Sequence, residues 1–222
     1  RYYMGSLYLT GFTIMSFLRG FCNLMEDMLI EPENVEKLAD LVFGFENDVI
    51  RQMADYGFHA VSLWDDWGTQ TDLMVAPDYW RRVFKPRYKE QFRIAHEHGL
   101  DVFFHSCGKV DEIVPDLIEV GVDMLNLGQP ALNAPDCKSG IEHMGKLYAG
   151  KVCFCTPADY QTTSIQGTPA ENREEVRRII ESMDTPDGGL IAYILDYTEN
   201  MGMPKDNYRA IIDAFVEYGK KS

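Results

Sequence analysis

Short apolar segments alternate along this chain with longer segments in which apolar residues recur every three or four positions. The short segments are rich in β-branched and aromatic residues and predict buried strands, whereas the longer ones predict amphipathic helices. The segment 33–56 is typical, with apolar residues on one helical face, Pro32 at its start and Gly57 just past its end. The predicted strands are 5–9, 60–64, 101–105, 122–127, 151–155 and 189–195.

The helices predicted between these strands carry ordinary start and stop signals. Pro86 lies inside the segment 77–98 and should kink or divide that helix. Thr168 and Glu171 have the spacing of a capping box, which predicts a helix running to about residue 183. The predicted helices are 12–21, 33–56, 77–98, 110–120, 135–144, 168–183 and 204–215.

This alternation of strands and helices predicts an α/β fold with a parallel sheet. About six βα units occur without a linker or a shift in composition, so we expect a single domain over residues 1–222. A closed (β/α)₈ TIM barrel needs eight units and typically about 250 residues. We therefore expect a (β/α)₈ barrel whose N-terminal part is absent, which the start at Arg1 without a methionine fits. An open doubly wound sheet is the alternative, although no Gly-x-Gly-x-x-Gly follows a strand.

Charge and cysteine content narrow the possible partners. The net charge of −14 opposes binding to nucleic acid and to anionic membranes, and we expect neither partner. No apolar run is long enough to span a bilayer. Five cysteines are an odd number and poor support for a disulfide framework, so we expect a reducing, cytoplasmic location. Exposed edge strands of an incomplete barrel predict a homodimer or a covering segment.

The candidate chemistry centres on the end of the strand 101–105. His105 and Cys107 are two positions apart, so both side chains can point the same way, and imidazole with thiolate suits zinc. Zinc needs at least three protein ligands, and Cys155, at the end of another strand, is the expected third. Asp65, Asp66 or Asp159 would supply an oxygen ligand. The alternative is a core histidine beside a buried free cysteine.

Other polar residues follow the remaining strands, where parallel α/β folds place their sites. Asp65 or Asp66 is expected to orient the substrate or act as a general base. In a metal-free reaction that needs protonation at carbon, Asp66 or Tyr197 would be the acid. Trp67, in the loop after the second strand, either walls a substrate pocket or packs beneath the loop. The further expected substrate contacts are Gln129, Asp159 and Asp196.

Several of these segments together resemble the uroporphyrinogen decarboxylase superfamily. They are 63–70 (LWDDWGTQ), 84–89 (FKPRYK), 104–108 (FHSCG), 121–123 (GVD) and 167–169 (GTP). The resemblance covers essentially the whole chain and implies the C-terminal two thirds of that family's (β/α)₈ barrel. It also implies one of two chemistries. These are metal-free decarboxylation of uroporphyrinogen, and cobalamin-dependent methyl transfer with zinc bound by His-x-Cys and a distant third ligand.

The His105-Ser106-Cys107 match favours the second chemistry. The resemblance then implies a zinc-dependent methyltransferase acting between a small methyl donor or acceptor and a corrinoid protein. Two departures keep alternatives open. Phe17 stands where the decarboxylases have a functional tyrosine, and Tyr197 stands where a late histidine or cysteine is found in the two branches. A metal-free decarboxylase and a non-catalytic binding module on a degenerate barrel therefore remain alternatives.

Overall fold

The computed structural model describes residues 1–194 and 201–220. The chain divides into two compact units, Arg1–Met124 (the first unit) and Leu125–Ser222 (the second unit), and each is described by itself. In the described part of the chain, no helix combines the length and the apolar character needed to cross a membrane.

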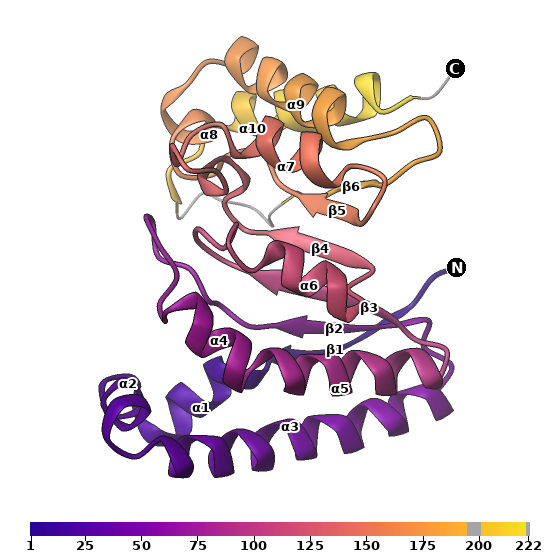
Figure 1. Cartoon of the computed structure of the whole chain (residues 1–222). Coiled ribbons are helices and arrows are strands. Elements are labelled where there is room, and N and C mark those ends of the chain that lie inside the picture. The colour runs from indigo at the N-terminus through magenta and orange to yellow at the C-terminus, as the bar shows by residue number, and fades with distance from the viewer. Residues whose placement is uncertain (195–200, 221–222) are drawn as a thin grey trace. The chain divides into compact units, whose positions relative to one another are not determined.

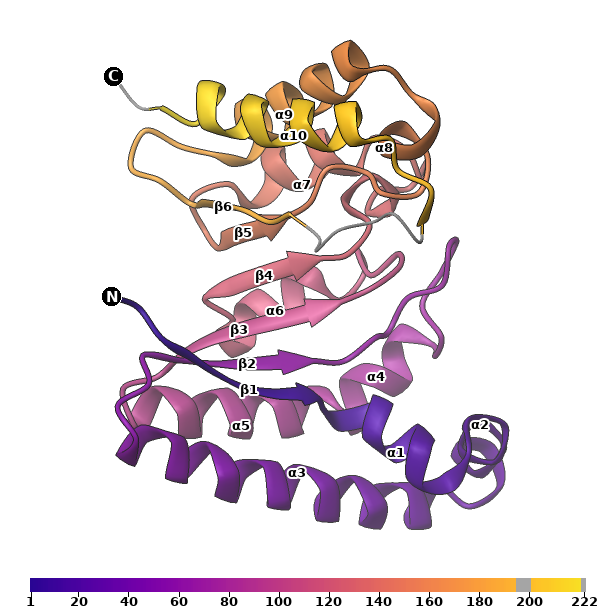
Figure 2. The same cartoon turned by 180° about the vertical axis from the view of Figure 1, so that it is seen from behind.

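The first unit is a parallel βα array. Strand β1 pairs with β2, and β2 with β3, in parallel register. Strands β2 and β3 are almost entirely buried, as expected for parallel strands covered on both faces. Helices α3 and α5 lie side by side along these strands (Figures 1 and 2). Its elements are β1 (Met4–Leu9), α1 (Gly11–Arg19), α2 (Phe21–Ile30), α3 (Pro32–Asp55), β2 (Ala60–Trp64), α4 (Pro77–Val83), α5 (Lys85–Glu97), β3 (Asp101–Ser106) and α6 (Val114–Val120).

Local sequence signals account for most boundaries in this unit. The predicted strand 60–64 is confirmed residue for residue. The predicted helix 77–98 is divided at Phe84, two residues before Pro86, into α4 and α5. The predicted helix 12–21 stops at Arg19 because Gly20 adopts a positive φ of 85°, and α2 follows as a separate helix.

In the second unit the strands again follow one another in the sheet in chain order, and β5 and β6 are parallel. Helix α9 packs against both α7 and α10 (Figure 2). The capping box predicted at Thr168 and Glu171 is present at the start of α9. The elements are β4 (Met124–Leu127), η1 (Pro130–Leu132), α7 (Gly140–Tyr148), β5 (Cys153–Thr156), α8 (Thr163–Gln166), α9 (Pro169–Met183), β6 (Leu190–Ala192) and α10 (Lys205–Tyr218).

Two predictions in this unit need correction. The helix predicted at 135–144 starts only at Gly140, because Asp136 accepts hydrogen bonds from the backbone N–H groups of Lys138 and Ser139 and holds a turn there. The strand predicted at 189–195 spans Leu190–Ala192, and its predicted last residue lies outside the described residues.

Within each unit, strands that follow one another in the chain are neighbours in the sheet, as in a (β/α)₈ barrel. The described residues supply six strands of such a barrel. The predicted count of about six βα units is confirmed.

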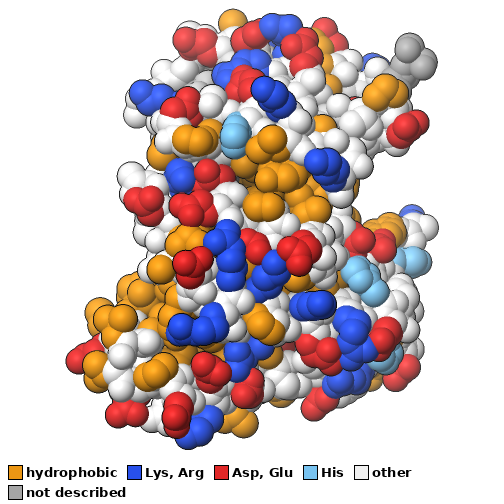
Figure 3. All heavy atoms as spheres, viewed as in Figure 1, with side chains coloured by type: hydrophobic (Ala, Val, Ile, Leu, Met, Phe, Trp, Pro, Cys, Tyr) orange, Lys and Arg blue, Asp and Glu red, His pale blue; other side chains and the backbone are white. Residues whose placement is uncertain are grey.

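On the face drawn in Figure 3, lysine and arginine side chains lie among acidic ones. Among the ion pairs of the described residues, Nζ of Lys85 lies 2.7 Å from carboxylate oxygens of both Asp116 and Glu119.

Candidate metal centre

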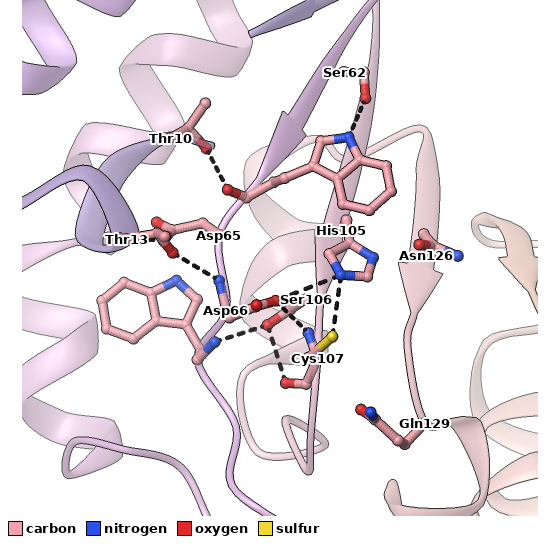
Figure 4. Close-up of polar contacts among 12 residues, drawn as sticks. Thr10, Thr13, Ser62, Asp65, Asp66, His105, Ser106, Cys107, Asn126 and Gln129 are labelled. Carbon is pink, nitrogen blue, oxygen red and sulfur yellow. Dashed lines mark hydrogen bonds and ion pairs between the residues drawn. The ribbon is translucent and has the colours of Figure 1, made fainter. Parts of the chain in front are cut away.

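The carboxyl ends of β2 and β3 bring three potential metal ligands together in the first unit. Trp64 and His105 are register partners, so the loops that follow them start side by side. The Nε2 atom of His105 lies 3.4 Å from Oδ1 of Asp66 and 3.3 Å from Sγ of Cys107. The three ligand atoms all lie within 4.8 Å of one another (Figure 4).

This spacing suits zinc. Tetrahedral coordination with Zn–N and Zn–O near 2.0–2.2 Å and Zn–S near 2.3 Å separates neighbouring ligand atoms by about 3.3–3.7 Å. The two distances from His105 Nε2 fall in this range. Imidazole nitrogen, thiolate sulfur and carboxylate oxygen are all zinc ligands, and three of them leave a position for another ligand. The residues present therefore fit a zinc ion.

Asp66 is oriented by its neighbours although its side chain is 43% exposed. Its Oδ1 accepts a hydrogen bond of 2.8 Å from the backbone N–H of Cys107. Partial burial raises the pKa of Asp66, but the interactions with His105 and Cys107 together lower that pKa below its ordinary value. The carboxylate is therefore anionic at neutral pH, as a ligand of a cation must be.

Packing on the neighbouring strand fixes the His105 ring. The ring centroids of Trp64 and His105 are 4.1 Å apart at an interplanar angle of 32°. The indole N–H of Trp64 donates to Oγ of Ser62 at 2.7 Å, which holds the indole in place (Figure 4). A ligand whose ring is held in this way loses little conformational freedom when a metal binds.

The loops after β2 and β3 are also joined through their backbones. The N–H of Gly68 donates to the carbonyl of Cys107 at 3.1 Å, and the N–H of Lys109 donates to the carbonyl of Thr69 at 2.8 Å. These bonds fix the loop carrying Asp66 relative to the loop carrying Cys107.

Asp65 occupies a different place from its neighbour Asp66. Its side chain is fully buried, and its carboxylate accepts hydrogen bonds from the backbone N–H groups of Phe12 and Thr13 and from the hydroxyl groups of Thr13 and Tyr88. Burial raises the pKa of Asp65 to about 7. Of the two aspartates predicted to contact the substrate, only Asp66 belongs to the cluster, and Asp65 anchors α1 instead.

Trp67 packs beneath its loop, which is the second of the two interpretations of this residue. Its side chain is fully buried, with ring centroids 4.6 Å from Phe12 and 4.5 Å from Phe84. Its indole N–H donates to the hydroxyl of Tyr88 at 2.9 Å. The assignment of Trp67 as a substrate contact is thereby corrected, because no part of the ring is exposed.

A family model described as Uroporphyrinogen decarboxylase (URO-D) matches residues 7–218. The chain belongs to the uroporphyrinogen decarboxylase family. No curated protein matches it. Its six strands and their helices are therefore part of the (β/α)₈ barrel of this family.

One solved structure agrees with this fold. A methyltransferase from Methanosarcina mazei aligns with a TM-score of 0.72 at 17% identity, over 98% of this chain and 59% of that one. The chain therefore spans about 59% of the length of that methyltransferase. A dihydropteroate synthase from Anaplasma phagocytophilum (TM-score 0.49, 15% identity, 97% and 74% covered) and the citrate synthase SbnG (TM-score 0.49, 12% identity, 78% and 71% covered) align more weakly.

The remaining predicted site residues of this URO-D family member belong to the second unit. The side-chain N–H of Gln129 donates to the Tyr160 hydroxyl at 2.7 Å. Burial raises the pKa of Asp159, but hydrogen bonds from the residues that follow it, up to Thr163, lower that pKa below its ordinary value. The Asp159 carboxylate thereby holds the turn that leads into α8.

Cys155 is buried, and burial raises the pKa of its thiol to about 12. Its role as a zinc ligand stays a prediction, as do the substrate contacts of Gln129 and Asp159. Asp196 and Tyr197 lie outside the described residues.

Proposed function

We propose that this URO-D family member is a zinc-dependent methyltransferase that moves a methyl group between a small molecule and a corrinoid protein. The convergence of Asp66, His105 and Cys107 on one point carries this proposal. These three residues would hold the zinc ion. When bound, zinc lowers the pKa of a thiol or alcohol that it binds, or polarises a methoxy group.

The chain's own residues would prepare this chemistry. Asp66 and Cys107 would bring two negative charges to balance Zn²⁺, and His105 would bind it as a neutral imidazole. The tilted ring of Trp64 packed on His105 and the paired loops would hold the ligands in place for the metal. Cys155 remains our predicted further ligand.

The loops at these strand ends offer no arginine cluster, so a tetrapyrrole substrate would need arginines from the N-terminal part of the barrel. A substrate with several carboxylates is best bound by a cluster of guanidinium groups. The segments that follow β2, β3, β4 and β5, namely 65–76, 107–113, 128–139 and 157–162, contain no arginine. Metal-free decarboxylation of uroporphyrinogen or a related acid remains the second candidate, supported by the family description.

Metal analysis tests the proposal. We expect about one zinc per chain in the wild-type protein, none in Cys107→Ser, and an unchanged amount in Cys22→Ser, a control at an exposed cysteine on α2. Stoichiometric zinc in Cys107→Ser would contradict the assignment. Elemental analysis of Cys155→Ser tests the predicted further ligand in the same series.

Activity then separates the candidates. Conversion between cob(I)alamin and methylcobalamin, followed by absorbance with methyl thioethers, methoxy compounds and thiols, should depend on Cys107 and on zinc. Turnover of uroporphyrinogen by metal-free protein would favour the decarboxylase. Zinc-free protein with neither activity would favour the binding module.

A further inference from the structure

The start of helix α1 is held by two buried carboxylates. The N–H of Gly11 donates to Oε1 of Glu46 at 2.7 Å. The N–H groups of Phe12 and Thr13 donate to the two carboxylate oxygens of Asp65 at 2.9 and 2.8 Å. The first N–H groups of a helix have no partner within the helix and carry partial positive charge, so anions are favoured there. These bonds fix α1 to α3 and to the end of β2.

Thr13 extends this anchor to the candidate metal centre. Its hydroxyl donates to Oδ1 of Asp65 at 2.8 Å and accepts from the backbone N–H of Asp66 at 3.2 Å (Figure 4). A hydroxyl group has one hydrogen and two lone pairs, so it can make both bonds at once. Thr13 therefore bridges the buried anchor and the backbone of a candidate ligand.

The bridge acts at Asp66, a partly exposed residue between two buried ones. Asp65 and Trp67 on either side are fully buried, whereas the Asp66 side chain is 43% exposed. Without the bond to its backbone N–H, only the contacts of its carboxylate with Cys107 and His105 would hold the Asp66 side chain away from water. We propose that Thr13 is a positioning residue that holds Asp66 toward His105 and Cys107 and thereby sets the zinc affinity of the centre. The affinity part of this inference rests on the proposed function.

Gly11 makes the close approach of α1 possible. Its φ of +51° lies in the left-handed region, and a Cβ atom there would lie 2.2 Å from Oδ2 of Asp65. The segment Gly11–Thr13 thus combines a residue without a side chain, for close contact, with a hydroxyl for the bridge.

Isosteric substitution tests the role of the hydroxyl. Thr13→Val keeps the shape and removes both bonds, and Thr13→Ser keeps the hydroxyl. Thr10→Val is the matched control. Thr10 immediately precedes α1, and its hydroxyl donates to the carbonyl of Trp64 rather than contacting Asp66. We expect zinc affinity, measured by competition with a chromophoric chelator, to fall about 10- to 100-fold in Thr13→Val and to stay at the wild-type level in the other two variants.

A merely structural role would lower the melting temperature of Thr13→Val and Thr10→Val and leave zinc affinity unchanged. That result would overturn the inference.

A second measurement needs no metal. The Cys107 amide donates to Oδ1 of Asp66, so its hydrogen exchange reports where that carboxylate lies. In metal-free Thr13→Val we expect faster exchange at Cys107, with unchanged exchange at Trp67, whose amide donates to Oγ of Ser106. If the wild-type protein binds no zinc, the proposed function fails, while unchanged exchange at Cys107 would separately overturn the role of Thr13.

Discussion

Gly68 and Gly108 lie in direct backbone contact, so the loops that carry Asp66 and Cys107 touch where neither has a side chain. A Cβ atom on Gly108 would lie 2.3 Å from the carbonyl carbon of Gly68, and one on Gly68 would lie 2.6 Å from the carbonyl carbon of Gly108. Gly108 also has a φ of +79°. The arrangement of the candidate metal ligands therefore depends on glycine at both positions.

Gly108→Ala should destabilise the protein by at least about 2 kcal/mol and weaken zinc binding, because strain at positive φ adds to a backbone clash that pushes the loops apart. Gly57→Ala is the matched control, with a φ of +76° and no atom within 4 Å of the added carbon. Urea denaturation and chelator competition measure both effects. Equal losses of stability in the two variants would show that only the φ angle matters.

Glu46 should make stability depend on pH. Burial raises the pKa of Glu46 to about 7 from an ordinary 4.5, despite hydrogen bonds from Gln91 and Gly11. Between these two values the folded protein binds more protons than the unfolded chain, so the free energy of unfolding falls as pH rises. The contribution of this carboxyl group to that fall is at most about 3 kcal/mol.

Glu46→Gln should flatten this dependence, because the amide does not titrate. The variant should therefore gain stability relative to the wild-type protein as pH rises from 4.5 to 8, as measured by denaturant titration at several pH values. Glu26→Gln, at an exposed position on α2, is the control. Parallel pH profiles for Glu46→Gln and the wild-type protein would refute this account.

The hydroxyl of Tyr88 connects Trp67 to Asp65, accepting from the first and donating to the second. Tyr88→Phe leaves the buried indole N–H of Trp67 without its acceptor and should cost about 1–3 kcal/mol of stability. Tyr79→Phe is the control, because the Tyr79 hydroxyl is buried without a hydrogen-bond partner in the described part of the chain. Thermal unfolding should separate the two variants, and similar melting temperatures would contradict the role given to Tyr88.

The sequence predicts those structural elements that depend on the local pattern of residues. The strand 60–64 and the capping box at Thr168 follow from apolar runs and residue spacing, and both are present. His105 and Cys107 could be paired because residues two apart at a strand end point the same way. The described structure places both in one cluster.

The sequence could not separate residues whose roles depend on long-range contacts. Asp65 and Asp66 are chemically identical neighbours, and only the register of β2 against β3 shows which one faces His105. The role inferred for Thr13 rests on hydrogen bonds to residues 52 and 53 positions away, which no local pattern encodes. The burial of Trp67 follows from its contacts with α1, α4 and α5 in the same way.

Asp66 should contribute to zinc affinity through its charge. Asp66→Asn keeps the size of the side chain but replaces an anionic oxygen ligand with a neutral amide, so we expect zinc to bind at least about tenfold more weakly. Asp72→Asn removes the same charge from the same loop, outside the cluster, and should leave affinity unchanged. Chelator competition at fixed ionic strength measures both variants. Equal losses would mean that Asp66 acts only through the general negative potential of an acidic protein, whereas a loss confined to Asp66→Asn would support direct coordination.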